Sequence, residues 1–180
     1  ADVQGMCQVF YENLTCSSSH LPKANFAWLV FNGKENIIME IRKAAAEDFD
    51  IVFDFIEKLW TYNTYDREEI RKVYMDVIDD ERSFAFLLWD EGICRGMCHG
   101  DYFNTFWMSG LTCYVSSLIT REEDRGKGYG VALLDHAKEL AKQRGCKAIT
   151  LDSGLPRTGA HGFYEHYGFE KSCYGFEMMI

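Results

Sequence analysis

Hydrophobic positions along the chain follow two different periods, which predict alternating strands and helices. Residues 37–43 alternate between apolar and polar positions, as a first strand would. Apolar residues at helical spacing predict a helix over 49–60, and Asp66 with Glu69 forms a capping-box pattern that begins a second helix. Three strands are then predicted, with a hairpin turn between the first two, at 84–89, 93–103 and 111–119.

The second half of the chain has a strand–helix–strand order. A glycine-rich turn after residue 120 opens a helix whose apolar stripe includes Leu133 and Ala141, and Gly145 is placed to end it. A strand and a crossover helix followed by a second strand form a parallel pair. The sequence therefore predicts an α/β fold of the α+β type, completed by a strand at 147–152, a helix at 159–167 and a closing strand from Phe169.

Residues 1–38 differ from the rest, because they mix aromatic residues, three consecutive serines and other polar residues without a sustained period. We expect an N-terminal extension over 1–38, of upstream or added sequence, and one domain over 39–180. Met39 is a candidate native start, since Gly33-Lys34-Glu35 can be encoded by purine-rich codons resembling a bacterial ribosome-binding site. Deleting residues 1–38 tests this hypothesis, which fails if the shortened chain cannot fold or act.

Composition narrows the classes of function. The 180 residues suffice for one domain with a core, and 47% of them are hydrophobic. The net charge of −9 argues against nucleic acid as a partner and is compatible with a cationic substrate such as an amine. No apolar run is long enough to span a bilayer, and no basic segment leads into an apolar block at the N-terminus, so we expect neither a membrane partner nor a secretory signal.

The seven cysteines show no disulfide framework, and we expect them to be mostly reduced in a cytoplasmic protein. Cys94 and Cys98-His99 form the tightest cluster, but no second ligand pair with zinc spacing follows. In an extended strand, positions 94, 96 and 98 share one face. This pattern favours buried thiols, and we expect no metal.

The turn RGKGYG, from Arg125 to Gly130, has the features of an anion site. A strand-to-helix junction directs several backbone N–H groups at one point, and glycines let the chain approach an anion closely. Arg125 and Lys127 add positive charge, so a phosphate or pyrophosphate is the expected ligand. A Walker loop is disfavoured because Gly128, not Ser or Thr, follows Gly126-Lys127. A dinucleotide-binding fold is disfavoured because antiparallel-looking segments precede the turn.

Two motifs in this order resemble the GCN5-related N-acetyltransferase (GNAT) superfamily. The turn matches the family's Gln/Arg-x-x-Gly-x-Gly/Ala pattern at Arg125, Gly128 and Gly130. Residues 163–169, FYEHYGF, are similar to the family's Phe-Tyr-x-x-x-Gly-Phe segment, and residues 151–161 are similar to one bacterial branch. The resemblance implies a mixed, mainly antiparallel sheet with a central, splayed parallel strand pair and flanking helices.

The same resemblance implies acetyl-coenzyme A as co-substrate. Its pantetheine arm would pair with backbone between the two splayed strands, and its pyrophosphate would sit on the glycine turn. Arg157 stands where many relatives have asparagine, and it would reach a phosphate or cap the short helix. The residues implied to bind the coenzyme are Leu118, Ile119, Thr120, Arg125, Gly126, Lys127, Gly128, Tyr129, Gly130 and Arg157.

Acetyl transfer to an amine needs proton transfer and oxyanion stabilisation. Tyr164 aligns with the family's tyrosine, and the resemblance implies that it is the general acid that protonates the leaving thiolate. The alternative is that the ring of Tyr164 packs against its neighbours and its hydroxyl only hydrogen-bonds the coenzyme. The general base stays open, because Ser116 and Ser117 stand where many relatives carry carboxylates, and serine alone is a poor base at pH 7. Candidates are His161, His99, Asp101 and Asp152.

We expect direct transfer to a primary amine of a small molecule or a peptide. Aromatic residues near the two early helices and strand 93–110 would form part of the acceptor wall, although each is more often ordinary core: Trp60, Tyr62, Tyr65, Tyr102, Phe103, Phe106 and Trp107. A non-catalytic acyl-CoA-binding sensor is the alternative function that the missing carboxylates leave open, and a nucleotide-binding regulator is a more distant one. A homodimer formed by strand addition also stays open.

Overall fold

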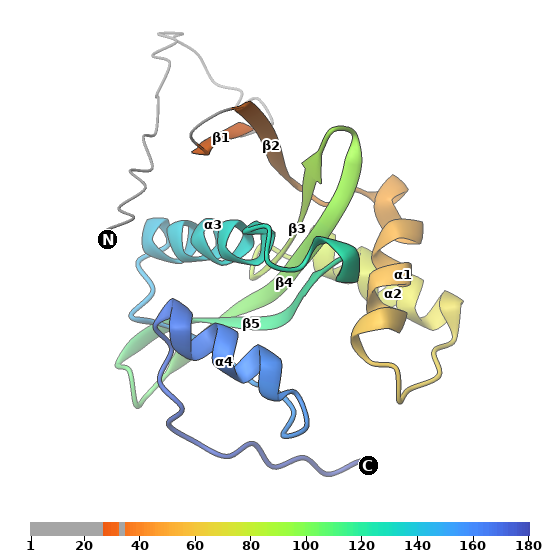
Figure 1. Ribbon diagram of the computed structural model, residues 1–180. Helices are drawn as coiled ribbons and strands as arrows, with labels where there is room; N and C mark the ends of the chain where they lie inside the picture. The colour runs from red at the N-terminus through yellow and green to blue at the C-terminus, as the bar shows by residue number, and fades with distance from the viewer. Residues whose placement is uncertain (1–26, 33–34) are drawn as a thin grey trace, which may run out of the picture.

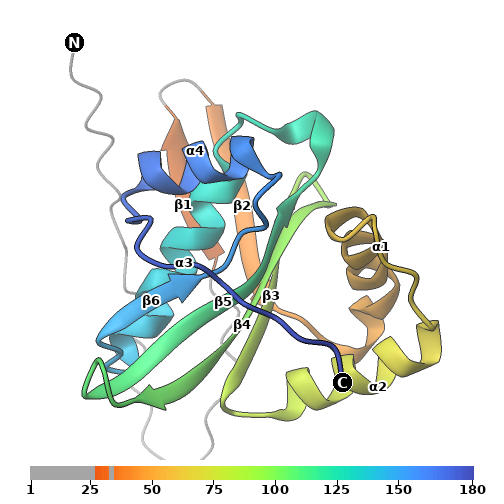
Figure 2. The same cartoon turned by 90° about the horizontal axis from the view of Figure 1, so that it is seen from below.

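A computed structural model describes residues 27–32 and 35–180, with side chains from residue 39 onward. Its strands form one six-stranded sheet in chain order (Figures 1 and 2). The neighbours from β1 to β5 are antiparallel, and β5 and β6 are parallel, which confirms the predicted mixed sheet. The strands are β1 (Ala27–Asn32), β2 (Glu35–Lys43), β3 (Ser83–Asp90), β4 (Ile93–Thr105), β5 (Gly110–Thr120) and β6 (Ala148–Leu151).

The predicted first strand corresponds to β2, which is preceded by β1 within the segment assigned to the N-terminal extension. The proposed boundary at residue 39 therefore falls inside β2, and its status as a native start stays a prediction. The remainder of that segment lies outside the described residues.

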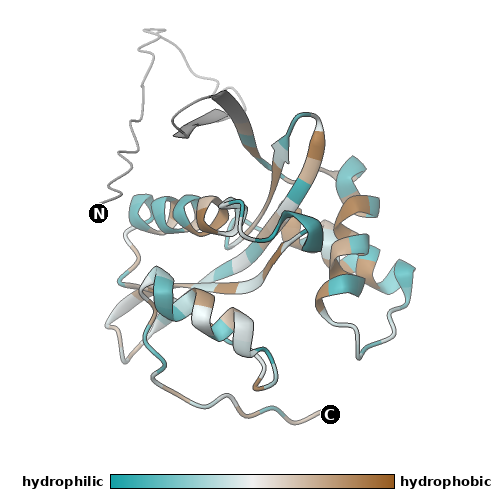
Figure 3. Cartoon of the chain, in the orientation of Figure 1, coloured by the Kyte–Doolittle hydropathy of each residue, from teal (hydrophilic) through white to brown (hydrophobic). Residues whose placement is uncertain are grey.

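Helices cover both faces of the sheet (Figure 2). α1 (Phe49–Leu59) and α2 (Arg67–Asp79) pack on one face, while α3 (Tyr129–Gln143) packs on the other with α4 (Thr158–Tyr167) beside it. α1 carries both apolar and polar residues (Figure 3), as a helix with one buried face requires. Leu87 and Leu88 are both fully buried, because successive strand residues face the α1–α2 core and the α3 core in turn.

A bulge in β5 changes which core its side chains face. His99 pairs with Ser117 and Gly100 pairs with Val115, so Ser116 has no partner in β4. Before the bulge, Val115 belongs to the α3 core. Beyond it the alternation is reversed, and Leu118 instead packs against that core.

A second bulge, in β4, corrects one expectation from the sequence. Leu88 pairs with Gly96 and Trp89 pairs with Cys94, so Arg95 is unpaired. The expectation that positions 94 and 98 share one face is wrong, because this extra residue puts Cys94 in the α1–α2 core and Cys98 in the α3 core. Both thiols are buried, as predicted.

The predicted closing strand is also wrong, because the chain after α4 joins no ladder. Gly168 adopts a left-handed φ of 114° and ends α4, and the N–H of Phe169 donates to the carbonyl of Tyr164 at 3.0 Å. The Phe169 ring lies 5.9 Å from that of Tyr164. Phe169 thus packs at the C-terminal end of α4 and forms no strand. Without a closing strand, β6 is the edge strand of the described sheet, so the parallel pair is not central.

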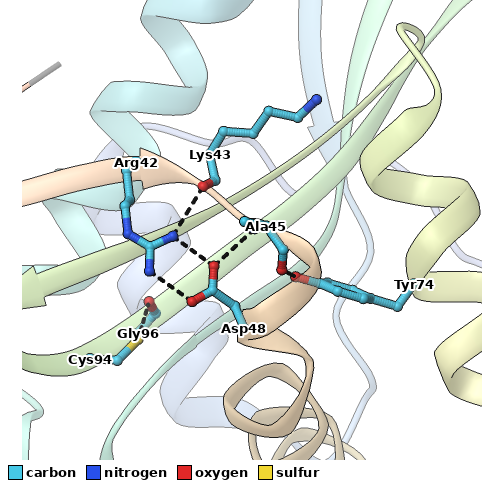
Figure 4. A network of polar contacts seen from close by, with 7 residues as sticks. All are labelled: Arg42, Lys43, Ala45, Asp48, Tyr74, Cys94 and Gly96. Carbon is cyan, nitrogen blue, oxygen red and sulfur yellow. Dashed lines mark hydrogen bonds and ion pairs between the residues drawn. The ribbon is translucent and has the colours of Figure 1, made fainter. Parts of the chain in front are cut away.

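A polar network fixes the α1–α2 layer to the sheet (Figure 4). The guanidinium of Arg42 donates to both carboxylate oxygens of Asp48, at 2.6 and 2.7 Å, and the N–H of Ala45 also donates to Asp48. The hydroxyl of Tyr74 on α2 donates to the carbonyl of Ala45 at 2.5 Å. Although burial opposes ionisation, these hydrogen bonds hold the pKa of Asp48 below its ordinary value.

Candidate functional site

The parallel strands separate before β5 ends. Their pairing runs from Thr112 with Ala148 to Val115 with Leu151, where β6 stops, whereas β5 continues to Thr120. In the described part of the chain no strand pairs with this side of residues 116–120. A cavity of about 810 Å³, here called the splay cavity, opens beside this free edge. The predicted splay is confirmed.

The splay cavity brings together most of the residues predicted to bind coenzyme. They line it with the predicted acid, Tyr164: Leu118, Ile119, Thr120, Arg125, Gly126, Gly128, Tyr129, Gly130 and Arg157. Lys127 is the exception. Its ammonium lies 2.7 Å from the carboxylate of Asp124, a residue that also lines the cavity.

The glycine turn has the backbone that its sequence predicts. Gly126 and Gly128 have φ values of 81° and 90°, a left-handed conformation that glycine adopts without strain. A Cβ built on either would meet no atom within 4 Å, so the space above the turn is open. Gly128 is the N-cap of α3 and has no side chain to satisfy the first N–H groups of the helix. The turn therefore offers an anion backbone donors in an open space.

Acidic residues balance the cations of this turn. Asp124 is buried and binds Arg95 at 3.3 Å as well as Lys127. A hydrogen bond from Lys127 holds the pKa of Asp124 below its ordinary value, against the opposing effect of burial. Arg125 pairs with Glu122 at 3.1 Å. Since these charges already have partners, the backbone N–H groups are the main unsatisfied donors for an anion.

Tyr129 attaches the start of α3 to the core of the protein. Its ring is buried in the α3 core, and its hydroxyl donates to the carboxylate of Asp90 at 2.5 Å. Burial and this hydrogen bond raise the pKa of Tyr129 to about 12. The side chain of Tyr129 thus fixes the start of α3 to the core, and its hydroxyl is already occupied by Asp90.

Close packing of α3 against α4 determines where Tyr164 lies. A Cβ on Gly130 would come within 3.2 Å of the Phe163 ring, so the absence of a side chain lets the two helices approach. The hydroxyl of Tyr167 donates to Asp135 of α3 at 2.6 Å. These contacts put the N-terminal half of α4 and Tyr164 along the wall of the splay cavity.

Tyr164 has the protonation state that a general acid needs. Its ring is half-buried, 5.3 Å from the Phe163 ring, and burial raises its pKa to about 12. The phenol is therefore protonated at neutral pH. Within residues 39–180 its hydroxyl makes no hydrogen bond, so it is available to a ligand in the cavity.

Arg157 closes the cavity on the side of α1. Its guanidinium donates to the carbonyl of Leu59 at 2.5 Å, at the C-terminal end of α1, where carbonyl groups favour a cation. Arg157 is the N-cap residue of α4, but its side chain makes no capping hydrogen bond. Its expected contact with a phosphate stays a prediction.

The candidate bases are spread over different places. Asp152 lines the splay cavity and accepts a hydrogen bond from the hydroxyl of Tyr114 at 3.0 Å. His99 lines a second cavity, on the α1–α2 side of the sheet. Neither Asp101 nor His161 lines either cavity; the His161 ring hydrogen-bonds the carbonyl of Gly154 at 3.1 Å.

This second cavity, here called the side cavity, has a volume of about 170 Å³. Of the aromatic residues expected at an acceptor site, Trp60 lines both cavities, Tyr62 lines the splay cavity and Tyr65 the side cavity. Tyr102 is instead core on the α3 side. The others are exposed near the β4–β5 hairpin and line neither cavity: Phe103, Phe106 and Trp107.

Comparison with known proteins assigns this architecture to a family. The sequence model of the acetyltransferase (GNAT) family matches residues 41–169. The chain belongs to this family. The predicted superfamily is therefore confirmed, and so is the predicted acetyl-CoA-dependent N-acetyltransferase with acetyl-CoA as co-substrate. Within residues 27–32 and 35–180, no helix combines the length and hydropathy that crossing a bilayer requires.

Individual relatives agree with this assignment. The chain is 33% identical to the uncharacterized N-acetyltransferase YhdJ of Bacillus subtilis, over 57% of this chain and 72% of that protein. It is 28% identical to the aminoalkylphosphonate N-acetyltransferase of Salmonella typhimurium, over 77% of this chain and 90% of the relative. The fold of an aminoglycoside N-acetyltransferase in complex with CoA matches with a TM-score of 0.71 at 12% identity, covering 82% of this chain and 97% of that one.

Sequence reasoning missed two features of this GNAT site. Asp124 was not among the predicted residues, although Glu122-Glu123-Asp124 directly precedes a turn that contains two cations. The apolar residues that line the side cavity, such as Ile56, Val73 and Met97, were also not predicted, although the two early helices and strand 93–110 were expected to form the acceptor wall.

Proposed function

We propose that this protein transfers the acetyl group of acetyl-CoA directly to a primary amine, in a complex that holds both substrates at once. The observation that carries this proposal is the free edge of β5 beside a cavity that both the glycine turn and Tyr164 line. The edge offers backbone groups to the pantetheine arm, as an added strand would. The N–H groups at the start of α3 suit its pyrophosphate.

The chemistry follows from the groups around the splay cavity. The amine nitrogen bonds to the thioester carbon, a backbone N–H near Leu118 or Ile119 stabilises the resulting oxyanion, and the carbon–sulfur bond then breaks. Tyr164 gives its proton to the departing sulfur, and the proton that the amine loses returns through water to the phenolate. Asp152, on the cavity wall, is a candidate to receive that proton on its way.

Direct transfer is favoured over an acetylated cysteine. Cys98 lines the side cavity, but burial raises the pKa of this thiol well above its ordinary value. A thiol that stays protonated is a poor nucleophile. The five described cysteines are free thiols, and a cytoplasmic location stays our proposal.

The alternative, a non-catalytic acyl-CoA-binding module, rests only on Ser116 and Ser117 supplying no carboxylate beside the splay cavity, and membership of the acetyltransferase family opposes it. Release of free CoA on adding amines to protein and acetyl-CoA separates the two. Turnover supports the enzyme. Tight binding of acetyl-CoA in a calorimeter, without CoA release for any amine of a broad panel, supports the binding module. Absence of acetyl-CoA binding would contradict both.

A further inference from the structure

The side cavity lies on the face of the sheet opposite α3. α1 and α2 supply one wall, including Ile56 and Val73, and strands β3 to β5 supply the other, including Ala85 and Met97. None of its lining residues is Asp, Glu, Lys or Arg. The cavity is therefore an apolar space without a fixed charge.

The polar groups that line this cavity add little charge to it. The hydroxyl of Tyr74 is already bound to the carbonyl of Ala45. Burial lowers the pKa of His99, against the opposing effect of Asp101, so its imidazole is neutral at pH 7. A second ammonium or a phosphonate would enter such a space without a counter-ion, which is costly.

The two cavities share two lining residues. Trp60, at the end of α1, and Ser116, at the bulge of β5, line both of them. Ser117 lines only the side cavity, whereas Leu118 lines only the splay cavity. A molecule whose body fills the side cavity can thus extend one end past Ser116 toward the place proposed for the acetyl group.

We propose that the side cavity holds the apolar body of the acceptor, so that the acceptor is a primary amine carrying one aromatic ring or one branched alkyl group. This inference rests on the proposed function. Its volume of about 170 Å³ is close to that of an apolar cavity of about 150 Å³ that admits benzene. It is below the range of roughly 300–1,000 Å³ for sites that take drug-sized ligands. Polycationic and phosphonate-bearing amines are accordingly poor acceptors.

An acceptor panel tests the chemical class. Phenethylamine and isoamylamine carry an apolar body, ethylamine lacks it, and spermidine and 2-aminoethylphosphonate carry a second charge. We expect kcat/KM for phenethylamine to exceed that for ethylamine by at least about 10-fold, because a single methylene group in an apolar pocket is already worth about 10- to 200-fold. Equal values for these two amines, or a clear preference for spermidine or 2-aminoethylphosphonate, would overturn the inference.

A pair of variants tests the location. Val73 is 57% exposed at the cavity wall, so Val73→Trp can fill the cavity with little disturbance of the core. Lys72→Trp is the matched control, since Lys72 is exposed on the same helix and lines neither cavity. Binding of phenethylamine in the presence of CoA, followed by ligand-observed NMR, should weaken at least tenfold in Val73→Trp and stay unchanged in Lys72→Trp. Unchanged acetyl-CoA affinity verifies that each variant is folded.

The binding measurement separates the two proposals. Suppose that phenethylamine binds the wild type, that this binding is lost in Val73→Trp, and that phenethylamine is never acetylated. The proposed function then fails, while the side cavity stands as an amine site. If amines are acetylated but Val73→Trp binds phenethylamine as wild type does, the side cavity fails and acetyl transfer stands. If phenethylamine does not bind wild type at all, the side cavity is only a packing void and the inference is wrong.

Discussion

Replacing Gly128 by alanine tests whether the turn binds the coenzyme through its backbone. Gly128 has a φ of 90°, and a non-glycine residue in a left-handed conformation costs roughly 1–2 kcal/mol. No atom lies within 4 Å of the added Cβ, so no clash adds to this cost. For a chain of this length, we expect Tm to fall by about 2–8 °C.

Gly145→Ala is the matched control, because Gly145 has a φ of 74°, equally open space and a position at the other end of α3. The same loss of stability is expected for both variants. Only Gly128 lines the splay cavity, where its Cβ would displace an anion from the N–H groups. Loss of one charge-assisted hydrogen bond is worth about 1.5–3 kcal/mol, or roughly 10- to 150-fold in affinity.

Calorimetric titration with acetyl-CoA measures this difference directly. The reasoning requires weaker binding in Gly128→Ala and wild-type affinity in Gly145→Ala at a temperature where both are folded. Equal affinities for the two variants would refute a backbone cradle at this turn, whatever their stabilities. Equal weakening in both would assign the effect to α3 as a whole and refute it as well.

Three further changes have definite outcomes. Tyr164→Phe should lower kcat by about 10²–10⁴-fold in a CoA-release assay with acetyl-CoA affinity nearly unchanged, and wild-type kcat would remove the acid role. Asp48→Asn should lower the free energy of unfolding at pH 7 by about 1.5–3 kcal/mol. The pKa of Asp48 is depressed in the folded state, so the stabilisation by its carboxylate is present above about pH 4 and lost below it. Denaturation curves of the variant and the wild type should therefore converge in acid. A difference in the free energy of unfolding that persists in acid would contradict this. Gly100→Ala should lower the free energy of unfolding by about 3 kcal/mol or more, because its Cβ would lie 2.1 Å from the Tyr114 carbonyl oxygen. Gly162→Ala, in open space on α4, should raise the free energy of unfolding, and urea unfolding measures both changes.

Local sequence patterns predicted the parts of this protein that local physics determines. The left-handed glycines and the start of α3 follow from backbone preferences within a few residues, and the amphipathic helices follow from their period. The parallel pair follows from the handedness of a crossover. The placement of ten predicted site residues along one cavity shows how much of the site these rules contain.

Each error depended on a contact that exists only in the folded chain, between two strands in the first case and within a few residues in the other two. The bulge at Arg95 is defined by its pairing with β3, so strand periodicity within β4 alone could not predict it. Phe169 has a sequence suited to a strand, but its contact with Tyr164 and the end of α4 determines its position. The pairing of Lys127 with Asp124 likewise appears only once η2 (Glu122–Asp124) has folded.

The bulge at Ser116 borders both cavities. A regular strand would keep residues 113, 115 and 117 on the α3 side and would bury residue 117 in that core. The inserted residue instead turns Ser117 toward the side cavity and Leu118 toward the splay cavity, while Ser116 itself borders both. The end of β6 leaves the edge proposed for the coenzyme, and the bulge in the ladder with β4 turns β5 toward the space proposed for the acceptor. Ser116, which the bulge leaves without a partner in β4, lies two positions before Leu118, where the proposed reaction has an oxyanion donor.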